Sequence, residues 1–170
     1  PDAVAAARIP ELEKSCEILG ISNLELLGYH DSGMLGWANN EDPDSFCATP
    51  VEDGAAKLAK LIEQYEPDVI VTYDENGFYG HPDHIQAHRI TMAAHEATRS
   101  NAKVYWGTVP KSMMEEFGKK VREACVVDWD DELPEGEDGT PDIGLPDDQI
   151  TTWIDISAYS ERKFNSLAAH

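Results

Sequence analysis

The sequence predicts an α/β fold in which helices cover both faces of a mainly parallel sheet. Amphipathic segments alternate with short β-branched and aromatic runs, in the order αβαβαβα, then a loop, then βα. Such alternation is typical of parallel strands joined by helical crossovers. The 170 residues suffice for one domain with a substantial core, so we treat residues 1–170 as a single domain.

The first predicted elements lie in residues 2–29. Residues 2–19 carry apolar side chains at helical spacing, and Gly20 suits the C′ position after such a helix. Pro10 lies inside this pattern and predicts that the helix proper begins near it. Leu24 to Tyr29 has the composition of a strand.

The central part of the chain predicts a loop, two helices and a strand. Residues 36–50, with two prolines and several acids, indicate a long surface loop. Residues 52–65 form an amphipathic pattern, and the apolar run Val69 to Tyr73 predicts a buried strand. Helical periodicity then runs from Pro82 to about Arg99, and Pro82 suits the first helical position.

The remaining elements are shorter. In order, they are a strand at 103–109, a helix at 111–124, a short segment Val126-Val127 that pairs briefly as a strand, an acidic loop at 128–142, a strand at 150–156 and a closing helix with Ser157 as its N-cap.

The charge limits the partners. The formal net charge is −20, which argues against nucleic acid or an anionic membrane because phosphate binding requires clustered Lys and Arg. No apolar run reaches membrane-spanning length and no secretion leader opens the sequence, so a cytoplasmic location is the default expectation. The sequence leaves the oligomeric state unknown.

The cysteines and the ends of the chain give two further expectations. Cys16, Cys47 and Cys125 are odd in number and widely spaced, which indicates reduced, unpaired thiols. The chain starts at Pro1 rather than Met, and His170 ends a helical pattern without a cap. We therefore expect both ends to be cut from a longer protein.

Residues 69–88 contain the strongest chemical pattern. His81, Asp83 and His84 fall in the first turn of a predicted helix that directly follows a strand. In open α/β sheets, ligands bind just beyond the carboxyl ends of the strands. The pattern therefore predicts a functional site, whereas a bare pair of histidines three residues apart would be weak evidence.

The two histidines need not share a role. The partial positive charge of a helix N-terminus disfavours a protonated imidazole, which suits His84 as a neutral metal ligand. If His81 is a protonated acid, it needs an anionic neighbour, and Asp83 is the obvious candidate. The simpler alternative is that one histidine caps the helix while the other packs in the core.

Other polar residues have two interpretations each. Tyr79 either donates its hydroxyl to a carbonyl near a metal or covers the helix end. Asp74 either orients a site histidine or makes an Asx turn, and Asp31 is a metal ligand, a contact to substrate hydroxyls or part of an ordinary Asp-Ser-Gly turn. His88 and His95 are expected to be hydrogen-bonded helix side chains. G-x-G-x-x-G, Walker A and G-x-S-x-G motifs are absent, which removes the usual support for nucleotide binding and serine hydrolase chemistry.

Two stretches, Leu27–Met34 and Thr72–His84, resemble the PIG-L/LmbE-like deacetylases, and the Gly-His-Pro-Asp-His motif carries most of the resemblance. This family includes the deacetylase of N-acetylglucosaminyl-inositol and the mycothiol S-conjugate amidase. The resemblance implies a Rossmann-like three-layer αβα sandwich. It also implies hydrolysis of an amide on a small amino-sugar substrate with one zinc ion per site, and Fe²⁺ accepts the same ligands.

The resemblance also implies roles for single residues. His84 would be the zinc ligand of this stretch, and His81 the acid or oxyanion stabiliser, tuned by Asp83. Tyr79 would help to polarise the substrate carbonyl. Judged from the residues alone, Arg8 would be solvated; by the resemblance, Arg8 and Asp31 hold the sugar-inositol substrate.

One family motif is absent from these residues. The segment Ala-His-Pro-Asp-Asp-Glu, which supplies two zinc ligands and the general base, would lie before Pro1. Two alternatives therefore stay open: a non-catalytic binding or regulatory domain that keeps the fold, and a metal-dependent phosphoesterase. The acidic charge and the lack of a basic cluster disfavour the phosphoesterase.

Overall fold

The computed structural model describes residues 2–123 and 143–169. The chain divides into two compact units, one made of residues 1–27 and 152–170 and the other of residues 28–151. Together they contain helices and a small parallel sheet, which is compatible with the predicted α/β class.

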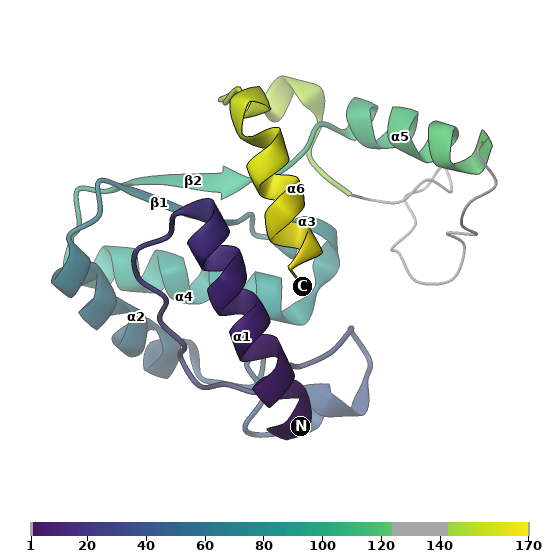
Figure 1. The fold of residues 1–170 in the computed structure, drawn as a ribbon. Helices are drawn as coiled ribbons and strands as arrows, with labels where there is room; N and C mark the ends of the chain where they lie inside the picture. The colour runs from purple at the N-terminus through teal and green to yellow at the C-terminus, as the bar shows by residue number, and fades with distance from the viewer. Residues whose placement is uncertain (1, 124–142, 170) are drawn as a thin grey trace. The chain divides into compact units, whose positions relative to one another are not determined.

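The first unit is built on two helices, α1 (Asp2–Leu19) and α6 (Ser160–Ala168), which lie against each other (Figure 1). The hydroxyls of Ser15 and Ser166 form a hydrogen bond between them. As predicted, Gly20 ends α1 in the left-handed region with φ 76°, and the next N–H donates to the Cys16 carbonyl at 2.9 Å.

The prediction that this helix begins near Pro10 is wrong, because α1 runs through Pro10 from Asp2. An interior proline removes one backbone hydrogen bond and crowds the preceding turn. The remaining hydrogen bonds of this long helix, together with its packing against α6, offset that cost.

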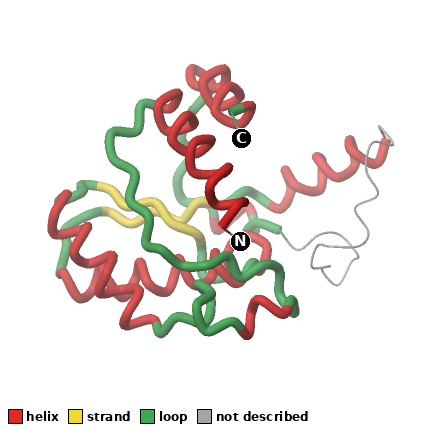
Figure 2. Tube along the Cα trace, turned by 60° about the horizontal axis from the view of Figure 1, so that its bottom comes forward, coloured by secondary structure: helices red, strands yellow, loops and turns green. Residues whose placement is uncertain are grey.

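The second unit contains one parallel pair of strands. Strand β1 (Val69–Tyr73) pairs with β2 (Lys103–Gly107) in a register that runs from Val69 opposite Lys103 to Tyr73 opposite Gly107 (Figure 2). The bounds of β1 are those predicted, and β2 ends two residues before the predicted end. The parallel pairing across a helical connection confirms the predicted crossover.

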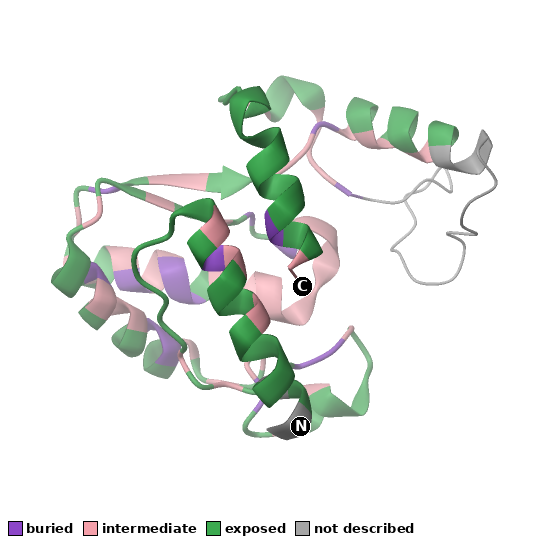
Figure 3. Ribbon diagram, viewed as in Figure 1, coloured by how far each residue is buried: buried purple, intermediate pink, exposed green. Residues whose placement is uncertain are grey.

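Two helices form the core of this unit. Helix α2 (Val51–Tyr65) packs against α4 (Pro82–Thr98), which also contacts β1. Figure 3 shows buried segments on both helices, and Ala55, Ile62 and Ala94 form their central cluster. The start and length of α2 and α4 agree with the sequence prediction to within one residue.

The strands predicted at 24–29 and 150–156 are not formed, since neither segment joins a ladder in the described part of the chain. A β-branched run becomes a strand only when a neighbouring strand completes its hydrogen bonds. The prediction of a buried β1 also fails for one face, where the side chains of Val69 and Val71 are 48% and 70% exposed.

The remaining elements are short turns and one helix. They are the 3₁₀ helices Ala38–Glu41, Asp147–Gln149 and Ser157–Tyr159, the helical turn α3 (Gly77–Gly80) and helix α5 (Lys111–Glu123). The prediction of Ser157 as an N-cap is wrong, because Ser157 lies inside its turn and its N–H donates to Asp155 Oδ1 at 2.9 Å.

Some predictions fall where the structure gives no description. The brief strand pairing expected of the segment 126–127, the acidic loop at 128–142 and the thiol of Cys125 lie outside the described residues. Cys16 and Cys47 are free, as predicted. Among the described residues, no helix combines the length and the apolar character needed to cross a membrane.

Candidate active site

The backbone between β1 and α4 folds into a strained turn. Within α3, Phe78 has φ 69° and ψ −52°, close to the rare γ-turn conformation with positive φ. A non-glycine residue rarely adopts such values, and strain of this kind concentrates at functional sites.

Asp74 holds this turn in place. Its side chain is buried, and Oδ1 accepts the Phe78 N–H at 2.9 Å while its backbone carbonyl accepts the Gly77 N–H at 3.0 Å. Of the two interpretations given to Asp74, the structure supports a turn-forming role over direct contact with a histidine.

His84 is oriented by the same turn. Its Nδ1 lies 3.1 Å from the Gly77 carbonyl oxygen, so Nδ1 carries the proton and Nε2 keeps its lone pair. Burial is the main reason that the pKa of His84 lies below its ordinary value; the hydrogen bond to Gly77 acts in the opposite direction. A neutral imidazole with Nε2 available is the form that binds a metal.

His81 is the N-cap of α4, and Pro82 occupies the first turn as predicted. The Asp83 N–H donates to His81 Nδ1 at 3.1 Å. Because Nδ1 accepts this hydrogen bond, a neutral His81 carries its proton on Nε2. One part of the simpler alternative therefore holds: His81 caps the helix.

The carboxylate of Asp83 contacts a distant loop. Its Oδ2 accepts the Ser32 N–H at 3.1 Å, whereas Oδ1 is buried and has no hydrogen-bond partner. A buried carboxylate oxygen without a partner is costly and marks a site that a donor or a cation can complete.

An aromatic cluster surrounds the two histidines. The ring of Tyr73 stacks on His84 with centroids 3.9 Å apart and planes 5° apart, and His81 lies 4.7 Å from His84. Tyr79 meets His84 edge-on at 5.1 Å. The structure thus brings together four of the six predicted site residues: Tyr79, His81, Asp83 and His84.

Sequence reasoning missed Tyr73. The one indication available was its position as the last residue of the strand before the motif. Burial, together with nearby Tyr79, raises the pKa of the Tyr73 hydroxyl above its ordinary value.

Asp31 lies in the loop that Asp83 contacts. Its Oδ1 accepts the Gly33 N–H at 2.9 Å, which makes the predicted turn, and its side chain is exposed. The next residue, Ser32, is fully buried, and its Oγ accepts the Cys47 N–H at 2.9 Å. Ser32 therefore joins the Asp31 turn to the start of α4, and sequence reasoning did not identify it.

Comparison with known proteins decides the family. Residues 1–95, more than half of the chain, match the family described as PIG-L, GlcNAc-PI de-N-acetylase. The chain belongs to the PIG-L family. This confirms the resemblance drawn from the two sequence stretches.

Several named relatives of this PIG-L chain are 1D-myo-inositol 2-acetamido-2-deoxy-alpha-D-glucopyranoside deacetylases. The one from Salinispora arenicola is 38% identical over 99% of this chain and 56% of its own length. Those from Acidothermus cellulolyticus and Thermobifida fusca are each 40% identical, over 99% and 96% of this chain and 59% and 60% of their own. The chain thus spans less than two thirds of the relatives that it matches.

Arg8, the sixth predicted site residue, lies on α1 in the first unit. Its guanidinium pairs with Glu11 at 2.8 Å on the exposed surface of the helix. Its contact with a substrate stays a prediction.

The other helix histidines of this PIG-L chain are hydrogen-bonded, as expected. His88 Nδ1 lies 2.9 Å from the Tyr73 carbonyl oxygen, and His95 Nε2 lies 3.0 Å from the carbonyl oxygen of Ala102.

A second group of residues has the composition of a metal site. Ligand atoms of His30, Asp42 and Asp44 all lie within 4.8 Å of one another. However, the group is largely exposed, and the Asp44 N–H donates to Asp42 Oδ1, which is the main reason that the pKa of Asp42 lies below its ordinary value. The contacts within this group explain it as a loop turn.

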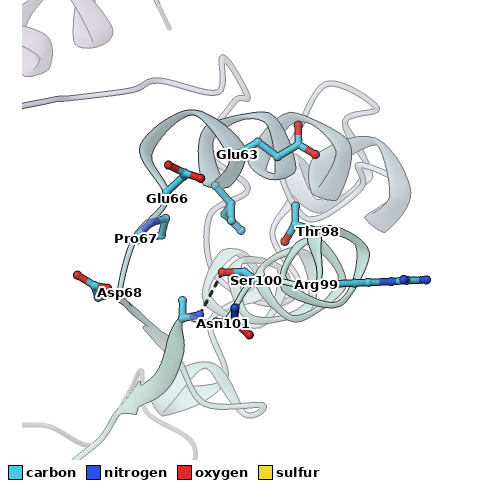
Figure 4. Close-up of a pocket in the computed structure, with 10 residues that line it drawn as sticks. Glu63, Glu66, Pro67, Asp68, Thr98, Arg99, Ser100 and Asn101 are labelled. Carbon is cyan, nitrogen blue, oxygen red and sulfur yellow. Dashed lines mark hydrogen bonds between the residues drawn. The ribbon is translucent and has the colours of Figure 1, made fainter.

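A cavity of about 500 Å³ lies near the C-terminal ends of α2 and α4 (Figure 4). Glu63, Glu66 and Asp68 line it, and Figure 4 shows the Arg99 side chain pointing away from the other labelled groups. It is located at the amino ends of the two strands, whereas the histidines follow the carboxyl end of β1. In parallel sheets the chemistry lies at the carboxyl ends, so we assign the cavity no role in the site.

Proposed function

We propose that this protein is a metal-dependent hydrolase that removes the acetyl group from an amino sugar such as an N-acetylglucosaminyl-inositol. The observation that carries the proposal is the His84 imidazole, whose Nδ1 is bound to a backbone carbonyl while Nε2 remains available for a metal. Membership of the PIG-L family and the names of the relatives supply the substrate class.

The donor set fits a zinc ion. A metal-ligating histidine nearly always donates its second ring N–H to a carbonyl or carboxylate, which is the arrangement of His84 and Gly77. The unpartnered, buried Oδ1 of Asp83 adds a negatively charged atom in the same turn. When bound, zinc supplies a Lewis acid for the amide carbonyl and lowers the pKa of water; iron accepts the same ligands.

His81 either donates a proton to the leaving amine or stabilises the negative charge that develops on the substrate oxygen. Because its Nδ1 accepts from the Asp83 N–H, its Nε2 is the donor nitrogen of the neutral ring. This supports donation of a hydrogen bond from Nε2 to the oxyanion. To protonate the leaving amine, His81 must first become an imidazolium, which also protonates Nδ1 and breaks its hydrogen bond with the Asp83 N–H. Asp83 holds His81 through its backbone, and its carboxylate keeps the Asp31 turn next to the helix.

Tyr79 and the substrate contacts complete the assignment. The Tyr79 ring meets both histidines edge-on, which supports its hydroxyl as a second donor to the substrate carbonyl. Asp31 uses Oδ1 in its own turn, and its second carboxylate oxygen can accept a hydrogen bond from a sugar hydroxyl. Arg8 is proposed to hold the same sugar-inositol. The alternative substrate is a mycothiol S-conjugate, which also carries an amide on an amino sugar.

We also propose that residues 1–170 belong to one domain with a Rossmann-like three-layer αβα architecture. The parallel β1–β2 pair and the helices α2 and α4 support one covered face of such a sheet. A crystal structure of the whole encoded protein tests this, and helices on one face alone would contradict it.

The functional test measures acetate released from N-acetylglucosaminyl-inositol by the whole encoded protein supplied with zinc. We expect His81→Ala to lower turnover by about 10²-fold or more, the usual contribution of a positioned acid–base group. We expect His84→Ala to lower turnover at least as far, because it removes a metal ligand. His95→Gln, which alters a histidine on the same helix that is bound to Ala102, serves as the control and keeps activity. Full activity of His84→Ala would refute the assignment. Release of phosphate from esters, or binding without turnover, would favour one of the two alternatives.

A further inference from the structure

The closest ring contact of the candidate site involves Tyr73, a residue without a chemical role in the proposed mechanism. Its ring and the His84 imidazole are nearly parallel, 5° apart, with centroids separated by 3.9 Å. The Tyr73 side chain is 37% exposed, and the ring face that stacks on His84 covers one face of the imidazole in place of water.

The backbone of Tyr73 is held by two contacts. It ends β1, where it pairs with Gly107 of β2, and its carbonyl oxygen lies 2.9 Å from His88 Nδ1. A side chain on a pinned backbone can act as a stop for its neighbour, since ring rotation of His84 would break the stack.

The stack and the hydrogen bond constrain different motions of His84. The Gly77 carbonyl selects the protonated nitrogen only while the imidazole stays in the plane that brings Nδ1 to it, and the parallel Tyr73 ring holds that plane. A terminal sp³–sp² torsion is otherwise broad, so a hydrogen bond alone leaves the imidazole plane loosely defined.

We infer that Tyr73 is a positioning residue for His84, which acts through the face of its ring and not through its hydroxyl. The inference rests on the proposed function only in naming His84 as the metal ligand. Because the ring face carries the effect, phenylalanine can replace Tyr73, whereas an aliphatic residue cannot.

The first test reads the imidazole directly, without metal and without substrate. Nitrogen NMR at pH 8 on the metal-free protein reports which ring nitrogen of His84 is protonated. We expect a single Nδ1–H form in the wild type and in Tyr73→Phe. We expect averaged nitrogen shifts in Tyr73→Ile, which keeps a residue suited to a strand.

The matched control is Tyr29→Leu. Tyr29 stacks on Phe46 in the same unit, with centroids 5.2 Å apart, and makes no ring contact with His84. It should lower stability while leaving the His84 nitrogen shifts unchanged. If Tyr73→Ile does not fold, Tyr73→Leu replaces it, and the amide spectrum away from the site reports folding. A folded aliphatic variant with an unchanged His84 tautomer would overturn the inference.

A second readout is zinc affinity of the whole encoded protein, measured by competition with a chelator. Loss of an orienting partner typically weakens binding by about 10- to 100-fold, which we expect for Tyr73→Ile and not for Tyr73→Phe. If Tyr73 shifts the tautomer as expected but the wild type hydrolyses no acetamido sugar, the proposed function fails and the positioning role stands. If the wild type hydrolyses the acetamido sugar but the aliphatic Tyr73 variant keeps the wild-type tautomer, the proposed function stands and the positioning role fails.

Discussion

At the scale of single residues, Gly77 meets two demands that no other residue type satisfies together. It has φ 64°, in the left-handed region, and the following helix lies too close to leave room for a Cβ atom. A Cβ atom at Gly77 would lie 2.8 Å from the backbone nitrogen of Ile85 and 2.9 Å from the Cβ of His84. The turn and the helix therefore approach each other at the histidine itself.

We predict that Gly77→Ala disrupts the site, while Gly36→Ala does not. Gly36 has a similar φ, 86°, but a Cβ there meets nothing within 4 Å. Gly36→Ala thus reports conformational strain alone, about 1–2 kcal/mol. Gly77→Ala adds overpacking of about 1–3 kcal/mol and displaces His84. Urea denaturation and zinc binding measure both effects; equal losses in the two variants would contradict the steric argument.

At the scale of elements, the contact between α2 and α4 depends on a missing side chain. Gly54 is buried on α2, and a Cβ there would lie 2.8 Å from Cγ2 of Ile90 on α4, itself buried. Glycine weakens an isolated helix, so its presence here is explained by the close approach of the two helices.

A double-mutant cycle tests this explanation. Gly54→Ala alone should destabilise the protein by about 1–2 kcal/mol, because overpacking exceeds the gain in helix propensity. In an Ile90→Ala background the same change should stabilise by about 1 kcal/mol, since the obstructing methyl group is gone. Free energies of unfolding in urea give the cycle, and additive effects would refute the close approach.

The elements also differ in how far the sequence predicts them. Helices α2 and α4 and strand β1 were predicted almost to the residue, because periodicity and proline position are local properties. The strands expected at 24–29 and 150–156 failed, because a strand depends on a neighbour that composition does not identify. The prediction that the first helix begins near Pro10 failed for a related reason, since the packing of α1 against α6 is not a local property of the sequence.

The candidate site follows the same division. His81, Asp83 and His84 were predicted because they are close in the sequence at a strand–helix junction. The contact of Asp83 with Ser32 joins residues that are 51 positions apart, and the stack of Tyr73 on His84 depends on side-chain direction. Neither property is encoded in spacing, so both were found only in the structure.

At the scale of the whole molecule, the net charge of −20 gives a prediction about salt. Repulsion among like charges destabilises the compact state, and salt screens it. We expect the melting temperature to rise between 10 mM and 0.5 M NaCl, by roughly 2–4 °C for each 1 kcal/mol gained. KCl at equal ionic strength should act alike, and an unchanged or lower melting temperature would contradict this.

The hydrogen bond between Ser32 and Asp83 should tolerate substitution at one of its two positions better than at the other, because Ser32 contributes its backbone and Asp83 its side chain. Ser32 donates to Asp83 from its backbone, so a residue small enough for this buried position, other than proline, can keep that contact. Its side chain serves a separate partner, the Cys47 N–H. Variation at position 32 should therefore loosen the loop around Cys47 and spare the helix start, whereas a change at Asp83 detaches the Asp31 turn from the start of α4.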